Sequence, residues 1–172
     1  LLQYFKQAGI AVLGIEPTAN TARAAEAKGI PTKVEFLGAA TARAIRAEGH
    51  RADLLAGNNV LAHAPDLNDL VEGLGILLAP EGTITLEFPH LLQLMRQNQF
   101  DTIYHEHFSY FSLLAARAVF ERHGLAVFDV DELPTHGGSL RVYLRHAANA
   151  AQPVSPAVKA LVVEERKSGL DR

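Results

Sequence analysis

The sequence predicts an α/β fold, a doubly wound and mostly parallel sheet with helices on both faces and an antiparallel hairpin at the C-terminal side. From Leu1 to Pro89, short apolar runs alternate with Ala- and Leu-rich helical stretches. This alternation is typical of parallel strands joined by helices. Two further apolar, β-branched runs after Gly124 are joined by "PTHGG", which predicts the hairpin.

Each element has a local signal in the sequence. The expected strands are residues 10–17, 31–36, 52–63, 82–89, 125–133 and 138–147. The expected helices are residues 1–9, 19–29, 39–49, 65–82, 90–100 and 112–124. Gly9, Gly29, Gly49 and Gly124 are placed to end helices. Asp66 and Ser112 are placed to cap the helices that follow them.

The chain divides into two predicted regions of unequal size. Residues 1–147 form the α/β domain, and residues 148–172 are a Pro-interrupted linker that enters a helix. The chain begins inside a helical pattern without an initiator Met, so we expect the domain to start upstream of Leu1.

Composition excludes several classes of function. The 172 residues are 48% hydrophobic and 20% charged, which is typical of a globular chain. A net charge of −3 gives no basic field for nucleic acid, and the absence of cysteine excludes disulfides and thiolate metal sites. No apolar run is long enough to span a bilayer, so we expect a cytoplasmic monomer that contacts neither nucleic acid nor membrane.

Polar residues follow several of the predicted strands, where ligands of such sheets bind. Glu16 follows the first strand and could accept hydrogen bonds from both hydroxyls of a nucleotide ribose, or could simply be a solvated residue before Pro17. Asn58 and Asn59 are either ligand contacts or turn residues, and His63 is either a site residue or a structural donor. Gly137 and Gly138 are expected in a loop that requires positive φ.

The stretch "DTIYHEHFSYFSLL", residues 101–114, gathers histidines, a glutamate and tyrosines. In a regular strand His105 and His107 would share one face, but a third metal ligand is missing, which disfavours a metal site. In an irregular backbone, Tyr104, Glu106 and His107 converge and provide a base, an orienting carboxylate and a phenol donor. We therefore predict an acid/base site without metal.

The motifs "VLGIEPTANTARAAEAKGIPT", "NNVLAHAPDLNDLV", "EFPHLLQLMRQNQFDTIYHEHFSYFSL" and "THGGSLRVYL" resemble the S-adenosylmethionine-dependent C-methyltransferases that act on nucleotide-linked keto-deoxysugars. The resemblance implies a Rossmann-like class I methyltransferase fold. In that family a four-Cys zinc domain comes first and a sugar-binding domain comes last. We therefore expect zinc only in a domain N-terminal to this chain, the first strand and the glycine-rich loop upstream of Leu1, and little activity from this chain alone.

The resemblance also assigns roles to residues. It implies that His107 is the general base, with Tyr104, Glu106 and His63 beside it. On the cofactor side it implies Glu16 at the ribose of S-adenosylmethionine, with Phe36 near the adenine and Asn58 and Asn59 near the methionine part. The substrate would be a small nucleotide sugar, deprotonated next to its ketone and methylated on carbon.

Two alternatives stay open at this point. An NAD(P)-dependent oxidoreductase would use the same type of sheet and a carboxylate such as Glu16. A methyltransferase-like domain without catalytic activity would keep the fold.

Overall fold

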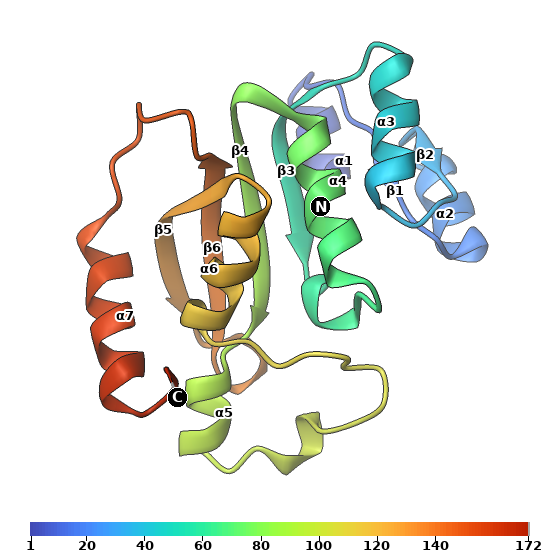
Figure 1. The fold of residues 1–172 in the computed structure, drawn as a ribbon. Coiled ribbons are helices and arrows are strands. Elements are labelled where there is room, and N and C mark those ends of the chain that lie inside the picture. The colour runs from blue at the N-terminus through green and yellow to red at the C-terminus, as the bar shows by residue number, and fades with distance from the viewer. Residues whose placement is uncertain (172) are drawn as a thin grey trace.

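The structure is a computed structural model that describes residues 1–171 (Figure 1). Its helices are α1 (Leu2–Gln7), α2 (Ala19–Glu26), α3 (Ala39–Ala47), α4 (Leu67–Leu77), α5 (Leu91–Arg96), α6 (Leu113–Arg122) and α7 (Pro156–Lys167). Its strands are β1 (Gly14–Ile15), β2 (Thr32–Lys33), β3 (Ala52–Asn58), β4 (Leu78–Pro89), β5 (Leu125–Leu133) and β6 (Ser139–His146). Short 3₁₀ turns lie at η1 (Leu61–His63), η2 (Phe100–Thr102) and η3 (Thr135–Gly137). Within the described residues, every helix is too short or too polar to cross a membrane.

The main sheet has four strands in the order β3-β4-β6-β5. Strands β3 and β4 are parallel, whereas β6 runs antiparallel to both β4 and β5. The predicted parallel strands and the C-terminal antiparallel hairpin are therefore both confirmed. Strands β1 and β2 form a separate parallel pair.

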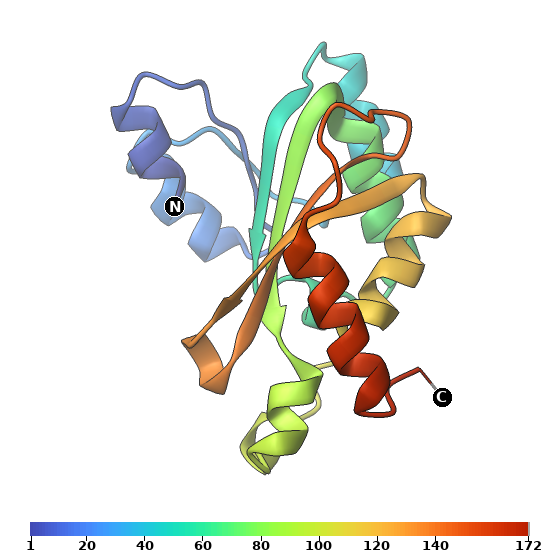
Figure 2. The ribbon, with the colours of Figure 1, turned by 90° about the vertical axis from the view of Figure 1, so that its left-hand side faces the viewer.

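The main core lies on one face of the four-stranded sheet. Alternate residues of β4 and β6 point into it, namely Ile84, Leu86, Phe88, Leu140, Val142 and Leu144. Helices α4, α6 and α7 cover this face, while α1 and α2 lie on the other side of the molecule, beside β3 (Figure 2). Val158, Leu161 and Val162 of α7 belong to the same core, so the end of the chain packs directly on the domain.

A second, smaller core joins the strand pair β1-β2 to the main sheet. Ala42 and Ile45 of α3 and Leu77 of α4 are buried in it, and Leu13, Ile15 and Leu55 pack against them. The side chain of Asp69 accepts a hydrogen bond from the Ala39 backbone N–H at 3.0 Å, which ties α4 to the start of α3. Helices α3 and α4 therefore pack against both the β1-β2 pair and the main sheet.

Most helix boundaries agree with the sequence. Asp66 and Ser112 cap α4 and α6 with their side chains, and the four predicted terminating glycines all have positive φ. The helix predicted over residues 65–82 is wrong at its end, because Leu78 is already extended and begins β4. Pro80 was the missed signal, since proline has no N–H and disfavours a helical conformation in the residue before it.

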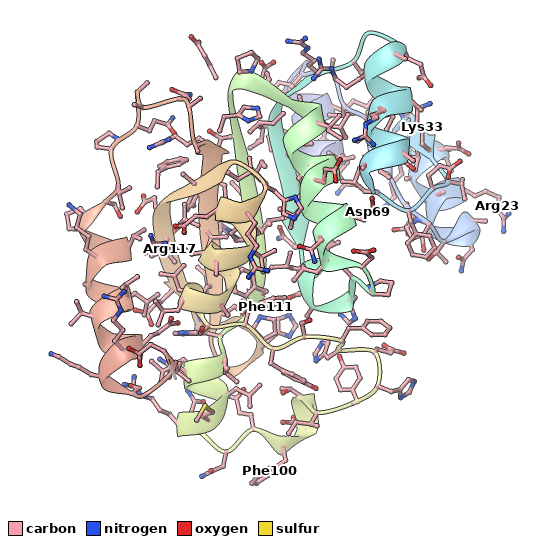
Figure 3. All side chains as sticks on the ribbon, viewed as in Figure 1. Arg23, Lys33, Asp69, Phe100, Phe111 and Arg117 are labelled. Carbon is pink, nitrogen blue, oxygen red and sulfur yellow. The ribbon has the colours of Figure 1, made fainter. Side chains whose placement is uncertain are left out.

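We expect Phe88→Ala to lower the free energy of unfolding by about 3–5 kcal/mol, because truncating a buried Phe leaves a cavity. Phe88 is fully buried in β4, and its ring packs edge-on against Phe111 with 5.5 Å between centroids. Urea denaturation would measure the change. Phe100→Ala is the matched control, because Phe100 is 76% exposed at the outer edge of the loop after α5 (Figure 3). Equal losses in the two variants would contradict this account of the core.

Candidate active site

The segment between α5 and α6 is irregular, as predicted, and is not a strand. After η2 the chain makes a turn in which the His107 N–H donates to the Tyr104 carbonyl at 3.0 Å. This turn brings the side chains of Tyr104 and His107 together, which a strand with alternating faces would not do for residues three apart.

Both ring nitrogens of His107 have a partner. Nδ1 lies 2.9 Å from the Thr102 carbonyl oxygen, and Nε2 lies 3.1 Å from the Tyr104 hydroxyl. A carbonyl oxygen can only accept, so we assign the ring proton to Nδ1 and a lone pair to Nε2. The His107 ring is thus held with its basic nitrogen toward the Tyr104 phenol.

His63 lies next to this pair. It ends η1, immediately beyond β3, and its ring centroid is 4.7 Å from that of His107. Nδ1 of His63 donates to the Glu106 carbonyl oxygen at 2.9 Å, and the Phe108 N–H donates to the Ala62 carbonyl at the same distance. The structure therefore brings His63, Tyr104 and His107 into one cluster, which we call the histidine cluster.

Glu106 takes a different place from the one expected. The predicted orienting contact from its carboxylate to the His107 ring is made instead by the Thr102 carbonyl. The Glu106 side chain is exposed, and this residue meets the cluster through its backbone oxygen on His63. The tight turn at Tyr104–His107 gives the physical reason, since it presents the Glu106 main chain to the cluster.

The residues expected on the cofactor side follow three different strands. Glu16 comes directly after β1, is half-buried, and accepts a hydrogen bond from the Thr18 N–H at 2.8 Å. Phe36 lies beyond β2 with 73% of its surface exposed. Asn58 is the last residue of β3 and is exposed. They are thus not part of the histidine cluster.

Asn59 has a contact that sequence reasoning missed. Its Nδ2 donates to Nε2 of His136 at 3.0 Å, and both residues have a left-handed backbone, with φ of 55° and 52°. Asn59 Oδ1 is shielded from solvent and has no hydrogen-bond partner among residues 1–171. The predicted positive φ of Gly137 and Gly138 is confirmed, and together with Pro134 these glycines are a local signal for the turn that positions His136.

A charged pair lies at the same end of the sheet, on the face opposite the main core. Glu87 is 6% exposed and accepts hydrogen bonds from Arg141 at 2.8 Å and from Thr135 Oγ1 at 3.1 Å. The hydrogen bond to Glu87 raises the pKa of Arg141, so the guanidinium stays charged. Two residues further along β6, on the same face, Tyr143 donates to Asp131 at 2.7 Å, and this hydrogen bond raises the pKa of the Tyr143 phenol.

Within the described part of the chain, no three His, Asp or Glu side chains are grouped so as to hold a metal ion. The histidine cluster instead combines a nitrogen lone pair, a phenol and a second imidazole. Imidazole and phenol groups placed in this way are of the kinds that serve as general bases and as hydrogen-bond donors in proton transfer.

Comparison with known proteins assigns the family. Residues 1–130 match the family described as "Methyltransferase domain", and residues 134–172 match "C-methyltransferase C-terminal domain". The C-methyltransferase NovU of Streptomyces niveus is 42% identical over 169 residues, which are 98% of this chain and 40% of NovU. The chain thus spans well under half the length of this relative.

Solved structures agree on the fold. A SAM-dependent methyltransferase from Anabaena variabilis superposes with a TM-score of 0.65 at 16% identity, covering 84% of this chain and 72% of that one. The magnesium protoporphyrin IX methyltransferase of Synechocystis, solved with bound SAH, gives 0.59 at 15% identity, covering 80% and 65%. Among the alternatives, the family match decides against an NAD(P)-dependent oxidoreductase. The fold agrees with the match over residues 1–130, and this match shows that the chain belongs to the methyltransferase domain family.

Proposed function

We propose that the protein is an S-adenosylmethionine-dependent C-methyltransferase that acts on a carbon next to the ketone of a nucleotide-linked deoxysugar. The observation that carries the proposal is the geometry of His107, whose Nδ1 is fixed on a carbonyl and whose Nε2 keeps a lone pair. Methylation of carbon requires a base to remove a proton from that carbon, and this nitrogen is suited to do so. The 42% identity to a C-methyltransferase supports the same reaction class.

The residues at the strand ends fit the cofactor. The two carboxylate oxygens of Glu16 can accept hydrogen bonds from two ribose hydroxyls. One of these oxygens also accepts a hydrogen bond from the Thr18 N–H. Asn58, exposed at the end of β3, offers an amide oxygen for an ammonium group, with Asn59 beside it. The exposed Phe36 ring offers an apolar face for an adenine. When bound, the cofactor supplies an electrophilic methyl group.

His107 takes the proton of the substrate carbon on Nε2 in our mechanism. The ring then carries a positive charge. Its Nδ1–H keeps donating to the Thr102 carbonyl, so the ring does not turn away during the transfer. The electron pair left on the substrate gives an enolate. Its carbon would form the new bond to the methyl group of the bound cofactor, while the methyl–sulfur bond of the cofactor breaks and the sulfur leaves as a neutral thioether.

Tyr104 and His63 serve the oxygen of this enolate. The Tyr104 hydroxyl donates to His107 Nε2 in the structure, so it must turn to the ketone oxygen when the substrate carbon approaches. The Nδ1–H of His63 donates to the Glu106 carbonyl. His63 can therefore donate from Nε2 only when the ring carries a proton on both nitrogens. Donors aimed at a developing oxyanion contribute about 10²–10³-fold in rate.

The role of Glu16 is tested by cofactor affinity. In the full-length protein, Glu16→Ala should weaken binding of S-adenosylmethionine by about 1–3 kcal/mol, because ribose hydroxyls lose their acceptor. Glu16→Gln should weaken it less, since an amide oxygen can still accept one hydroxyl and the Thr18 N–H. Calorimetry with Glu26→Ala, an exposed carboxylate on α2, provides the control. Unchanged affinity in Glu16→Ala would remove the residue from the cofactor site.

The role of His107 is tested by proton exchange. In the full-length enzyme, His107→Asn should keep cofactor affinity and lose about 10²-fold or more in methyl transfer. It should also slow the exchange of the substrate proton with deuterated solvent, which NMR follows without methyl transfer.

Neighbouring variants separate the parts of this mechanism. Tyr104→Phe and His63→Asn should slow exchange as well, because the enolate loses a donor. Glu106→Gln should have a smaller effect than any of these, since its carboxylate is exposed and its backbone contact is kept. Exchange at the wild-type rate in His107→Asn, with methyl transfer lost, would show that another group is the base.

A further inference from the structure

One buried carboxylate connects both ends of the segment that carries the histidine cluster. Glu165 of α7 is fully buried and accepts three hydrogen bonds. The donors are His90 Nε2 at 2.8 Å, the Leu113 N–H at 2.7 Å and the Leu114 N–H at 2.8 Å. His90 directly follows β4, and Leu113 begins α6, so these contacts bracket residues 91–112.

Other contacts also join the two ends of the same segment. The Leu91 N–H donates to the Phe111 carbonyl at 2.9 Å, next to an isolated parallel bridge between His90 and Phe111. The His90 N–H donates to the Gly138 carbonyl at 3.0 Å, which adds the β5-β6 hairpin. Figure 3 shows Phe111 at one of these ends, inside the molecule, and Phe100 at the far rim of the loop.

The buried contacts have a defined hydrogen-bonding pattern. His90 Nδ1 has no partner among residues 1–171, so we assign the ring proton to Nε2, where it reaches Glu165. Ser112 Oγ accepts from the Ala115 N–H at 3.0 Å, so α6 already has its local cap. Glu165 therefore satisfies the two remaining free N–H groups at the start of α6 and, with the same carboxylate, the His90 side chain.

The middle of the segment has few hydrogen bonds to the rest of the molecule, although Thr102, Tyr104 and His107 are bonded to one another. Phe100, Ile103 and Phe108 are 76%, 63% and 61% exposed. Two hydrogen bonds join this part to η1, from Phe108 to Ala62 and from His63 to Glu106, and one joins it to η3, from Gln99 Nε2 to the Gly137 carbonyl at 2.8 Å. The ion pair between Arg96 on α5 and Glu164 on α7 lies on the surface, where such pairs contribute little. The position of Tyr104 and His107 relative to His63 thus depends on how the two ends are held.

We propose that Glu165 is a positioning residue of the active site, which holds both ends of residues 91–112 so that Tyr104 and His107 face His63. This inference rests on the proposed function. It also means that a residue within the part matching the C-methyltransferase C-terminal domain, 134–172, sets the geometry of a site carried by the part matching the methyltransferase domain, 1–130.

Amide hydrogen exchange of the full-length protein tests the proposal. Glu165→Gln retains shape and one acceptor but cannot accept all three hydrogen bonds, so amides of residues 97–112 should exchange about tenfold faster. Amides of β4 and β6 should keep their wild-type rates. Glu164→Gln is the matched control, since it changes the neighbouring carboxylate on the surface, and it should leave residues 97–112 at the wild-type rate. In Glu165→Ala, if this variant folds, the amides of residues 97–112 should exchange faster than in Glu165→Gln.

Kinetics give a second readout that a merely structural role would not produce. Glu165→Gln should lower kcat for methyl transfer about tenfold, with KM for S-adenosylmethionine within about twofold of wild type. Absence of methyl transfer in the wild-type protein would contradict the proposed function. The amide exchange comparison would still test whether Glu165 holds residues 97–112 in place. Wild-type exchange of residues 97–112 in Glu165→Gln, or an acceleration shared equally by β4 and β6, would overturn the proposal.

Discussion

The register of β4 between its two neighbours is the constraint on which the rest of the structure depends. Parallel pairing with β3 places Asn58 opposite Glu87, and antiparallel pairing with β6 places Ser139 opposite Pro89. The end of β3, the end of β4 and the start of β6 therefore meet at one edge. Because side chains alternate along a strand, a slip of one residue would send Glu87 into the core and Phe88 out of it. Register, core and site are thus fixed together.

Main-chain carbonyls orient the two histidines of the cluster, and this has chemical consequences. Thr102 holds His107 and Glu106 holds His63, each through Nδ1. A carboxylate in the same place would stabilise a charged imidazole more strongly, whereas a carbonyl mainly fixes the tautomer and the ring direction. Each ring therefore keeps a lone pair on Nε2 in its neutral form. In the proposed mechanism, the backbone of the turn at residues 102–107 thus has a direct part in the chemistry, in addition to carrying the side chains.

The sequence predicted local features well and long-range contacts poorly. Helix caps, terminating glycines and the C-terminal hairpin depend on neighbouring residues, so they could be read directly. Strands β1 and β2 are shorter than expected, because they pair only with each other among the described residues. The cluster of Tyr104, His107 and His63 followed from the unusual composition of one stretch and from resemblance. The contacts of His90 with Glu165 and of Asn59 with His136 join residues 75 and 77 positions apart, and no local pattern indicates such pairs.

Fixed ends and an exposed middle suit a segment whose residues must change partners during a reaction. The Tyr104 hydroxyl is bonded to His107 in the structure, and in the proposed mechanism it has to leave that nitrogen for the substrate oxygen. A 43% exposed side chain can make this rotation without disturbing the core. In that mechanism the rings must nevertheless return to the same place in each turnover, and the contacts of the fully buried Glu165 would hold the ends of the segment in place for this. Stability is therefore distributed unevenly along residues 91–112, high at both ends and low where the substrate would bind.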